Sequence, residues 1–63
     1  MIELTKLNDT KITVNAEIIE LVEETPNTVV TLTTGRKLIV QETRNEVTDL
    51  VISYKRAIYN SDL

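Results

Sequence analysis

Residues 28–41 read TVVTLTTGRKLIVQ and predict two β-strands that fold back at Gly35, the only glycine in the chain. The length of the loop decides which side chains share a face. A three-residue loop over residues 33–35 pairs Val30 with Leu38, whereas a two-residue loop sets apolar residues against polar ones. A slip of one residue moves every side chain to the other face, so the apolar pattern favours the longer loop. The apolar face then carries Val30, Leu32, Leu38 and Val40.

The expected loop is a type I turn followed by a residue in the left-handed conformation. Glycine adopts that conformation without a steric penalty because it has no Cβ atom. Gly35 is therefore assigned a role in the backbone. Any contact that this hairpin makes with a partner is expected from the charged residues after the turn, Arg36 and Lys37.

The rest of the chain completes one small α+β domain over residues 1–63. Strands are expected at about 2–7, 11–15, 18–24, 28–33 and 36–41. The segment 18–24 has paired apolar residues, which fit either a short helix or a strand buried partly on both faces, and its β-branched residues favour the strand. The five strands are expected to form one antiparallel sheet, either strongly curled or partly barrel-like, packed by one C-terminal helix.

The predicted helix runs from about residue 44 to residue 59 and begins at a capping box, in which Thr43 and Glu46 bond each other's free backbone N–H groups. Apolar residues then recur at helical spacing on one face, at Val47, Leu50, Val51, Tyr54 and Ile58. This stripe is expected to cover the open face of the sheet. Ile52 lies off the stripe, and it is interpreted either as an ordinary exposed isoleucine or as part of a contact with another subunit.

Composition narrows the classes of function. The chain has 63 residues with no cysteine and no histidine, so disulfides, thiolate metal sites and the commonest general base are missing. A core of this size rarely supplies more than about 3–5 kcal/mol, and self-association as a homo-oligomer is the expected support. Seven basic and ten acidic residues give a net charge of −3, which disfavours nucleic acid as a partner.

The sequence shows no sign of membrane insertion or export. No apolar run approaches the roughly 20 residues that span a bilayer. The N-terminal residues MIELTK lack the charged region and the apolar core of a signal peptide. A cytoplasmic protein without a transmembrane segment is therefore expected.

No set of residues points to catalysis or to a cofactor. The glutamates at positions 17, 20, 23 and 24 have no diagnostic spacing, and we interpret them as a solvated acidic edge rather than a metal site. A single glycine cannot build a phosphate-binding loop. The prediction is a non-enzymatic protein with no catalytic, cofactor-binding or metal-binding residues. The candidate contacts for a partner are two basic pairs, Arg36 with Lys37 and Lys55 with Arg56.

Several segments, in their order and spacing, resemble the small flagellar FlbD family over roughly residues 1–58. They are MIELTKLN at 1–8, NAEIIE at 15–20, TPNT at 25–28, GRKLIV at 35–40, EV at 46–47 with Glu42 before it, and YKR at 54–56. Two positions depart from the family pattern. Asp9 stands where the family usually has glycine, and Thr34 stands where asparagine is usual.

The resemblance implies a bacterial cytoplasmic protein that supports flagellar motility, and in the swarming members of the family this role concerns the power of the flagellar motor. The leading hypothesis is a protein-binding module whose partner is a cytoplasmic component of the motor or its assembly, placed peripherally at the flagellar base. The alternative is a small nucleic-acid-binding regulator of flagellar gene expression. An enzyme or carrier of small molecules is the least favoured class, because the usual catalytic bases are missing.

Overall fold

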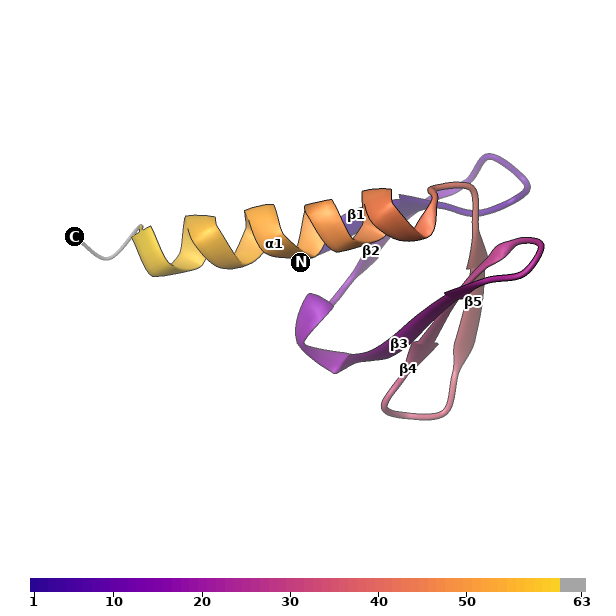
Figure 1. Ribbon diagram of the computed structural model, residues 1–63, viewed down its shortest axis with the longest axis horizontal. Coiled ribbons are helices and arrows are strands. Elements are labelled where there is room, and N and C mark those ends of the chain that lie inside the picture. The colour runs from indigo at the N-terminus through magenta and orange to yellow at the C-terminus, as the bar shows by residue number, and fades with distance from the viewer. Residues whose placement is uncertain (61–63) are drawn as a thin grey trace.

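The computed structural model describes residues 1–60, so residues 61–63 of the expected domain lie outside the described part. Five strands, one short 3-10 turn and one helix follow one another along the chain (Figure 1). They are β1 (Ile2–Thr5), β2 (Lys11–Val14), η1 (Ala16–Ile18), β3 (Ile19–Glu24), β4 (Thr28–Leu32), β5 (Lys37–Val40) and α1 (Arg44–Asn60).

The strands form two antiparallel sheets, and the expectation of one five-stranded sheet is wrong. One sheet consists of β1 and β2, and the other has the order β3-β4-β5, without a closed barrel. The division has a local cause after β2. The Asn15 side chain accepts a hydrogen bond from the Glu17 N–H (3.0 Å), and the Ile18 N–H donates to the Asn15 carbonyl (3.1 Å). This 3-10 turn redirects the chain, so β3 starts a new sheet instead of extending the first.

The two sheets meet at one isolated bridge between Lys6 and Val40. Beside it, the Gln41 N–H donates to the Thr5 carbonyl (2.8 Å). This junction brings the end of β1 against the end of β5, which are far apart in the sequence.

The predicted register of the central hairpin is confirmed. Val30 lies opposite Leu38, and the Leu32 N–H donates to the Arg36 carbonyl (2.8 Å). Gly35 closes the turn at φ +91°, a conformation that favours glycine. Of the four residues assigned to the apolar face, three are buried and Leu38 is half-buried.

The segment that fitted either a helix or a strand contains both. Ile18 ends the 3-10 turn η1, and β3 follows from Ile19 to Glu24. A register shift between Ile19 and Leu21 marks a bulge, which places apolar residues of β3 on both faces of the sheet. The paired apolar pattern of this segment therefore comes from a bulged strand.

Helix α1 begins at the predicted capping box. The Thr43 N–H donates to Glu46 Oε1 (2.8 Å), and the Glu46 N–H donates to Thr43 Oγ1 (3.1 Å). Val47 is completely buried, and Val51 and Tyr54 pack against the core. The core residues come from every layer of the fold: Ile2, Leu4, Val14, Ala16, Val30, Leu32, Val40 and Val47.

Helix α1 packs against the core as far as Tyr54. The end of the helix projects beyond both sheets, toward the C-terminus in Figure 1. Of the predicted apolar stripe, Val47 is 0% exposed, whereas Leu50 is 36% and Ile58 is 41% exposed. Contacts to β3 and η1 hold the helix at two points: the Arg44 N–H donates to Glu24 Oε1 (2.9 Å), and Lys55 Nζ lies 3.8 Å from Glu17 Oε1.

Candidate functional site

A shallow groove at the junction of the two sheets gathers cationic side chains, and we call it the basic groove. Its volume is about 440 Å³. One wall is the turn that follows β1, and the other is the beginning of β5. Its lining residues are Lys6, Leu7, Asn8, Arg36, Lys37, Leu38 and Ile39.

Hydrogen bonds from Gln41 hold the two walls together. The Gln41 side-chain NH₂ donates to the Lys6 carbonyl (2.9 Å) and to Asp9 Oδ1 (2.7 Å). Asp9 itself adopts φ +69°, the left-handed conformation for which glycine is the usual residue. The carboxylate that Asp9 carries instead gives the turn a contact to Gln41 that glycine would lack.

Charge and apolar exposure coincide in the basic groove. Three of the lining side chains are cationic and none is a carboxylate. Leu7 is 52% exposed and Ile39 is 46% exposed, so apolar surface lies between the cations. This combination suits a ligand that carries negative charge together with apolar side chains.

Backbone groups of β5 also face the basic groove. The Arg36 carbonyl accepts a hydrogen bond from across the hairpin, whereas the Gln41 N–H donates away from β4 to the Thr5 carbonyl (2.8 Å). Successive residues of a strand point their backbone groups to opposite sides. Lys37 and Ile39 therefore turn their N–H and C=O groups toward the groove, along the outer edge of β5.

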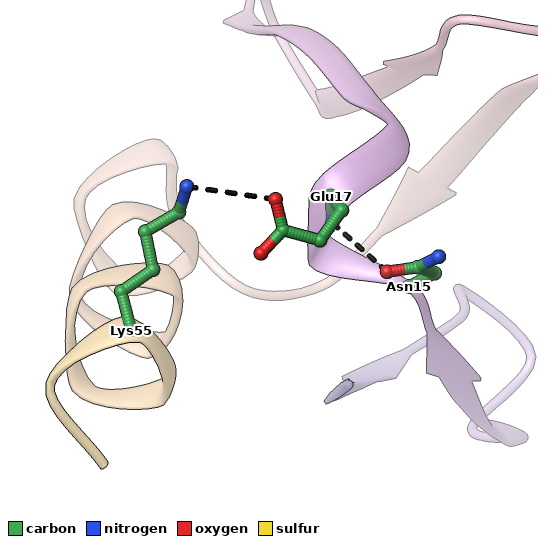
Figure 2. Close-up of polar contacts among 3 residues, drawn as sticks. All are labelled: Asn15, Glu17 and Lys55. Carbon is green, nitrogen blue, oxygen red and sulfur yellow. Dashed lines mark hydrogen bonds and ion pairs between the residues drawn. The ribbon is translucent and has the colours of Figure 1, made fainter. Parts of the chain in front are cut away.

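The structure brings together two of the four predicted contact residues. Arg36 and Lys37 both line the basic groove. Lys55 lies on α1 and forms an ion pair with Glu17, whose backbone N–H is held by Asn15 (Figure 2). Within residues 1–60, no hydrogen bond or ion pair connects either helix cation with the groove. Arg56 is exposed on the helix.

Lys6 belongs to the basic groove, although the sequence did not single it out. Its neighbours in β1 are buried, and the alternation places Lys6 on the same side as Ile2 and Leu4. The bridge from Lys6 to Val40 and the hydrogen bonds of Gln41 bring Lys6 beside β5. A single bridge between two sheets leaves no local pattern in the sequence, so the position of Lys6 could not be predicted.

A second polar cluster centres on Glu42, immediately after β5. The Thr5 N–H donates to Glu42 Oε1 (2.9 Å) and the Thr5 hydroxyl donates to Glu42 Oε2 (2.8 Å). Lys11 Nζ donates to the same Thr5 oxygen (2.9 Å). The carboxylate thus occupies the outer edge of β1, where a neighbouring strand would otherwise bond the Thr5 N–H.

The surroundings of Glu42 favour its charged form. Burial raises the pKa of this carboxyl, but hydrogen bonds from the Thr5 N–H, the Thr5 hydroxyl and its own N–H outweigh that effect, with a smaller contribution from the Lys11 charge. The net pKa lies below the usual glutamate value. The cluster therefore depends on the ionised form of Glu42. Its hydrogen bonds connect β1 with the residue that follows β5, so we call it the Glu42 clamp between β1 and β5.

The fold and the basic groove define a small α+β protein with an exposed cationic and apolar surface. No helix within residues 1–60 is long and apolar enough to cross a membrane. The model of the FlbD family, flagellar and swarming motility proteins, matches residues 1–59 of the 63-residue chain. The chain belongs to this family, which confirms the resemblance found in its sequence and gives it a role in flagellar and swarming motility. Neither a curated protein nor a solved structure matches the chain significantly.

Proposed function

We propose that this chain is a non-enzymatic protein-binding module of flagellar motility, and that the basic groove binds an acidic segment of a cytoplasmic motor or assembly component. The family supports the motility role. The observation that carries the binding proposal is the convergence of Lys6, Arg36 and Lys37 with Leu7 and Ile39 around one groove without a carboxylate.

The charge of the groove is opposite to that of the whole chain. The chain has a net charge of −3, whereas the lining of the groove contains three cations and no carboxylate, so the local charge is opposite in sign. Complementary charge steers association and suppresses wrong partners more than it adds affinity. An acidic partner would therefore be repelled by most of this surface and attracted to the groove.

The open edge of β5 indicates the conformation of the bound segment. An extended segment could pair with the backbone groups of Lys37 and Ile39 and add a strand beside β5. Lys37 and Ile39 lie on the same face of β5, so one face of the added strand would meet a cation and an apolar side chain, while the other face would meet Arg36. The expected ligand is an extended segment that carries an acidic and an apolar residue two positions apart.

Three further features belong to the proposal. The module acts peripherally at the flagellar base, and its binding supports the power of the flagellar motor. The chain also self-associates as a homo-oligomer, through an open strand edge or through the outer face of α1. Its small core supports this part of the proposal, because a chain of 63 residues buries limited apolar surface by itself.

The test compares two double variants of equal net charge. Arg36→Gln with Lys37→Gln removes two cations from the groove, and Thr13→Glu with Thr48→Glu makes the same change in net charge at exposed sites outside it. Both are produced in a motile cell that lacks the wild-type gene. We expect the groove variant alone to lose swarming and to lose its partner in pull-down, with circular dichroism of both variants unchanged.

Normal swarming and normal partner capture by the groove variant would refute the proposed site. Loss of function in both double variants would show that net charge matters and the groove does not. If the wild-type protein instead binds RNA or DNA with a steep salt dependence, and captures no protein, the nucleic-acid-binding alternative replaces the proposal.

A further inference from the structure

The face of α1 that points away from the core carries a regular arrangement of charge and apolar surface, which we call the outer helix seam. Its members are Asp49, Ile52, Arg56 and Tyr59. Their spacing of three, four and three residues is the spacing at which side chains line one side of a helix in helix–helix contacts. All four side chains are exposed, with Ile52 at 42% and Tyr59 at 76%.

The two charges of the seam are not engaged within the chain. Among residues 1–60, neither the Asp49 carboxylate nor the Arg56 guanidinium takes part in an ion pair or hydrogen bond. The neighbouring cation on the helix, Lys55, already lies 3.8 Å from Glu17. A partner can therefore reach both charges of the seam, Asp49 and Arg56, without breaking an existing contact.

We propose that a second copy of this chain docks on the outer helix seam, with its own α1 running antiparallel. A two-fold axis between Ile52 and Ser53 places Asp49 of each copy across from Arg56 of the other. The same axis brings the two Ile52 side chains together at the centre. A parallel pair would instead set Asp49 against Asp49 and Arg56 against Arg56, and like charges at such a contact are destabilising.

The surroundings of Asp49 strengthen this complementarity. Asp49 lines an open cleft of about 400 Å³ between α1 and the β1–β2 sheet. Its other charged lining residues are Glu3, Lys11, Glu42 and Glu46, so carboxylates outnumber the single cation. Arg56 of the second copy would approach a region of negative potential that extends beyond one side chain.

The shape of the molecule accommodates this arrangement. The end of α1 projects beyond the sheets (Figure 1), so antiparallel docking would set the sheets of the two copies at opposite ends of the helix pair. Each projecting end then gains a neighbour along its length. A short helical segment is marginal by itself in water, so packing against a second helix would stabilise the part of α1 that the strands leave uncovered.

This inference deepens the self-association within the proposed function and is independent of the basic groove. It predicts a symmetric, concentration-dependent dimer. The contact consists of one helix face per copy, which places it among small interfaces of weak affinity. Partner binding at the groove and dimerisation at the seam are separate measurements, so failure of one does not decide the other.

The experiment is a charge swap followed by sedimentation over a dilution series of the purified protein. Asp49→Arg sets two arginines against each other across the dimer, and Arg56→Asp sets two aspartates against each other. Each single variant is expected to weaken dimerisation by about tenfold or more. The double variant D49R/R56D exchanges the charges and is expected to restore it, with unchanged helix content by circular dichroism.

A cysteine variant gives a second readout that does not depend on charge. The chain has no cysteine, so Ile52→Cys introduces a single thiol beside the proposed two-fold axis. Mild oxidation is expected to link this variant into a covalent dimer, whereas Leu21→Cys, at a similarly exposed site on β3, stays monomeric. A wild-type protein that is monomeric at every concentration, or a double swap that stays as weak as the single variants, would overturn the proposal.

Discussion

Replacing Glu42 with glutamine tests the clamp between β1 and β5. The substitution keeps the size of the side chain and removes its charge. In the wild-type protein one carboxylate accepts hydrogen bonds from the N–H and the hydroxyl of Thr5, a residue only 8% exposed. Glutamine offers one carbonyl oxygen, so its NH₂ group faces a donor where the second carboxylate oxygen was. The attraction to Lys11 is lost as well.

The structure gives the size of the expected effect. A hydrogen bond to a charged group contributes about 1.5–3 kcal/mol, and a buried donor left without a partner costs a similar amount. Glu42 is half-buried, which places the expected loss near the lower end, at about 2 kcal/mol. A change of about 1 kcal/mol moves the Tm of a domain this small by about 4–8 °C, so a decrease of about 8–16 °C follows.

The pH dependence provides a second signature. The folded-state pKa of Glu42 lies below its unfolded value, so the carboxylate contributes stability at pH values above the unfolded pKa. That contribution is lost as the pH falls through the folded-state pKa, which lies below the usual glutamate pKa. The difference in stability between wild type and E42Q should therefore be largest near neutral pH and shrink in acid.

Urea denaturation followed by circular dichroism, repeated along a pH series, measures both signatures. Glu20→Gln is the matched control, because the Glu20 side chain is exposed and takes part in no hydrogen bond or ion pair within residues 1–60. The control is expected to stay within about 0.5 kcal/mol of wild type. A difference between wild type and E42Q that is absent at neutral pH, or that stays constant into acid, would refute the reasoning.

Two other substitutions test local backbone features. Gly35→Val should destabilise the fold by about 1–2 kcal/mol, because Gly35 is at φ +91° and a Cβ atom there meets no atom within 4 Å, so the cost comes from the backbone alone. Unchanged urea stability of this variant would contradict the turn assignment. Thr43→Ala should cost about 1 kcal/mol by removing half of the capping box, and hydrogen exchange should show faster opening at the start of α1. Equal exchange rates in both proteins would show that the cap contributes nothing.

Local patterns predicted the parts of the fold that depend on neighbours in sequence. The hairpin register followed from the alternation around Gly35, and the helix start followed from Thr43 and Glu46. The division into two sheets was not predictable in this way. It depends on the turn that Asn15 stabilises and on one bridge between residues 34 positions apart, Lys6 and Val40.

The candidate site shows the same contrast. Arg36 and Lys37 are adjacent in the chain, so their shared surface could be expected from the sequence alone. Lys6 joins them only through the packing of the two sheets. The role of Glu42 was also not evident from the sequence, because its partner Thr5 lies 37 residues earlier. Polar contacts between distant residues leave no periodic signal in the sequence.

The connection between the two sheets gives binding a consequence for the whole fold. The walls of the basic groove belong to different sheets, which the Lys6–Val40 bridge, the hydrogen bonds of Gln41 and the Glu42 clamp join. A ligand that contacts both Lys6 and Lys37 connects the two sheets. Its binding free energy then opposes separation of the sheets, and a rising melting temperature would report occupancy of the groove without any label on the ligand.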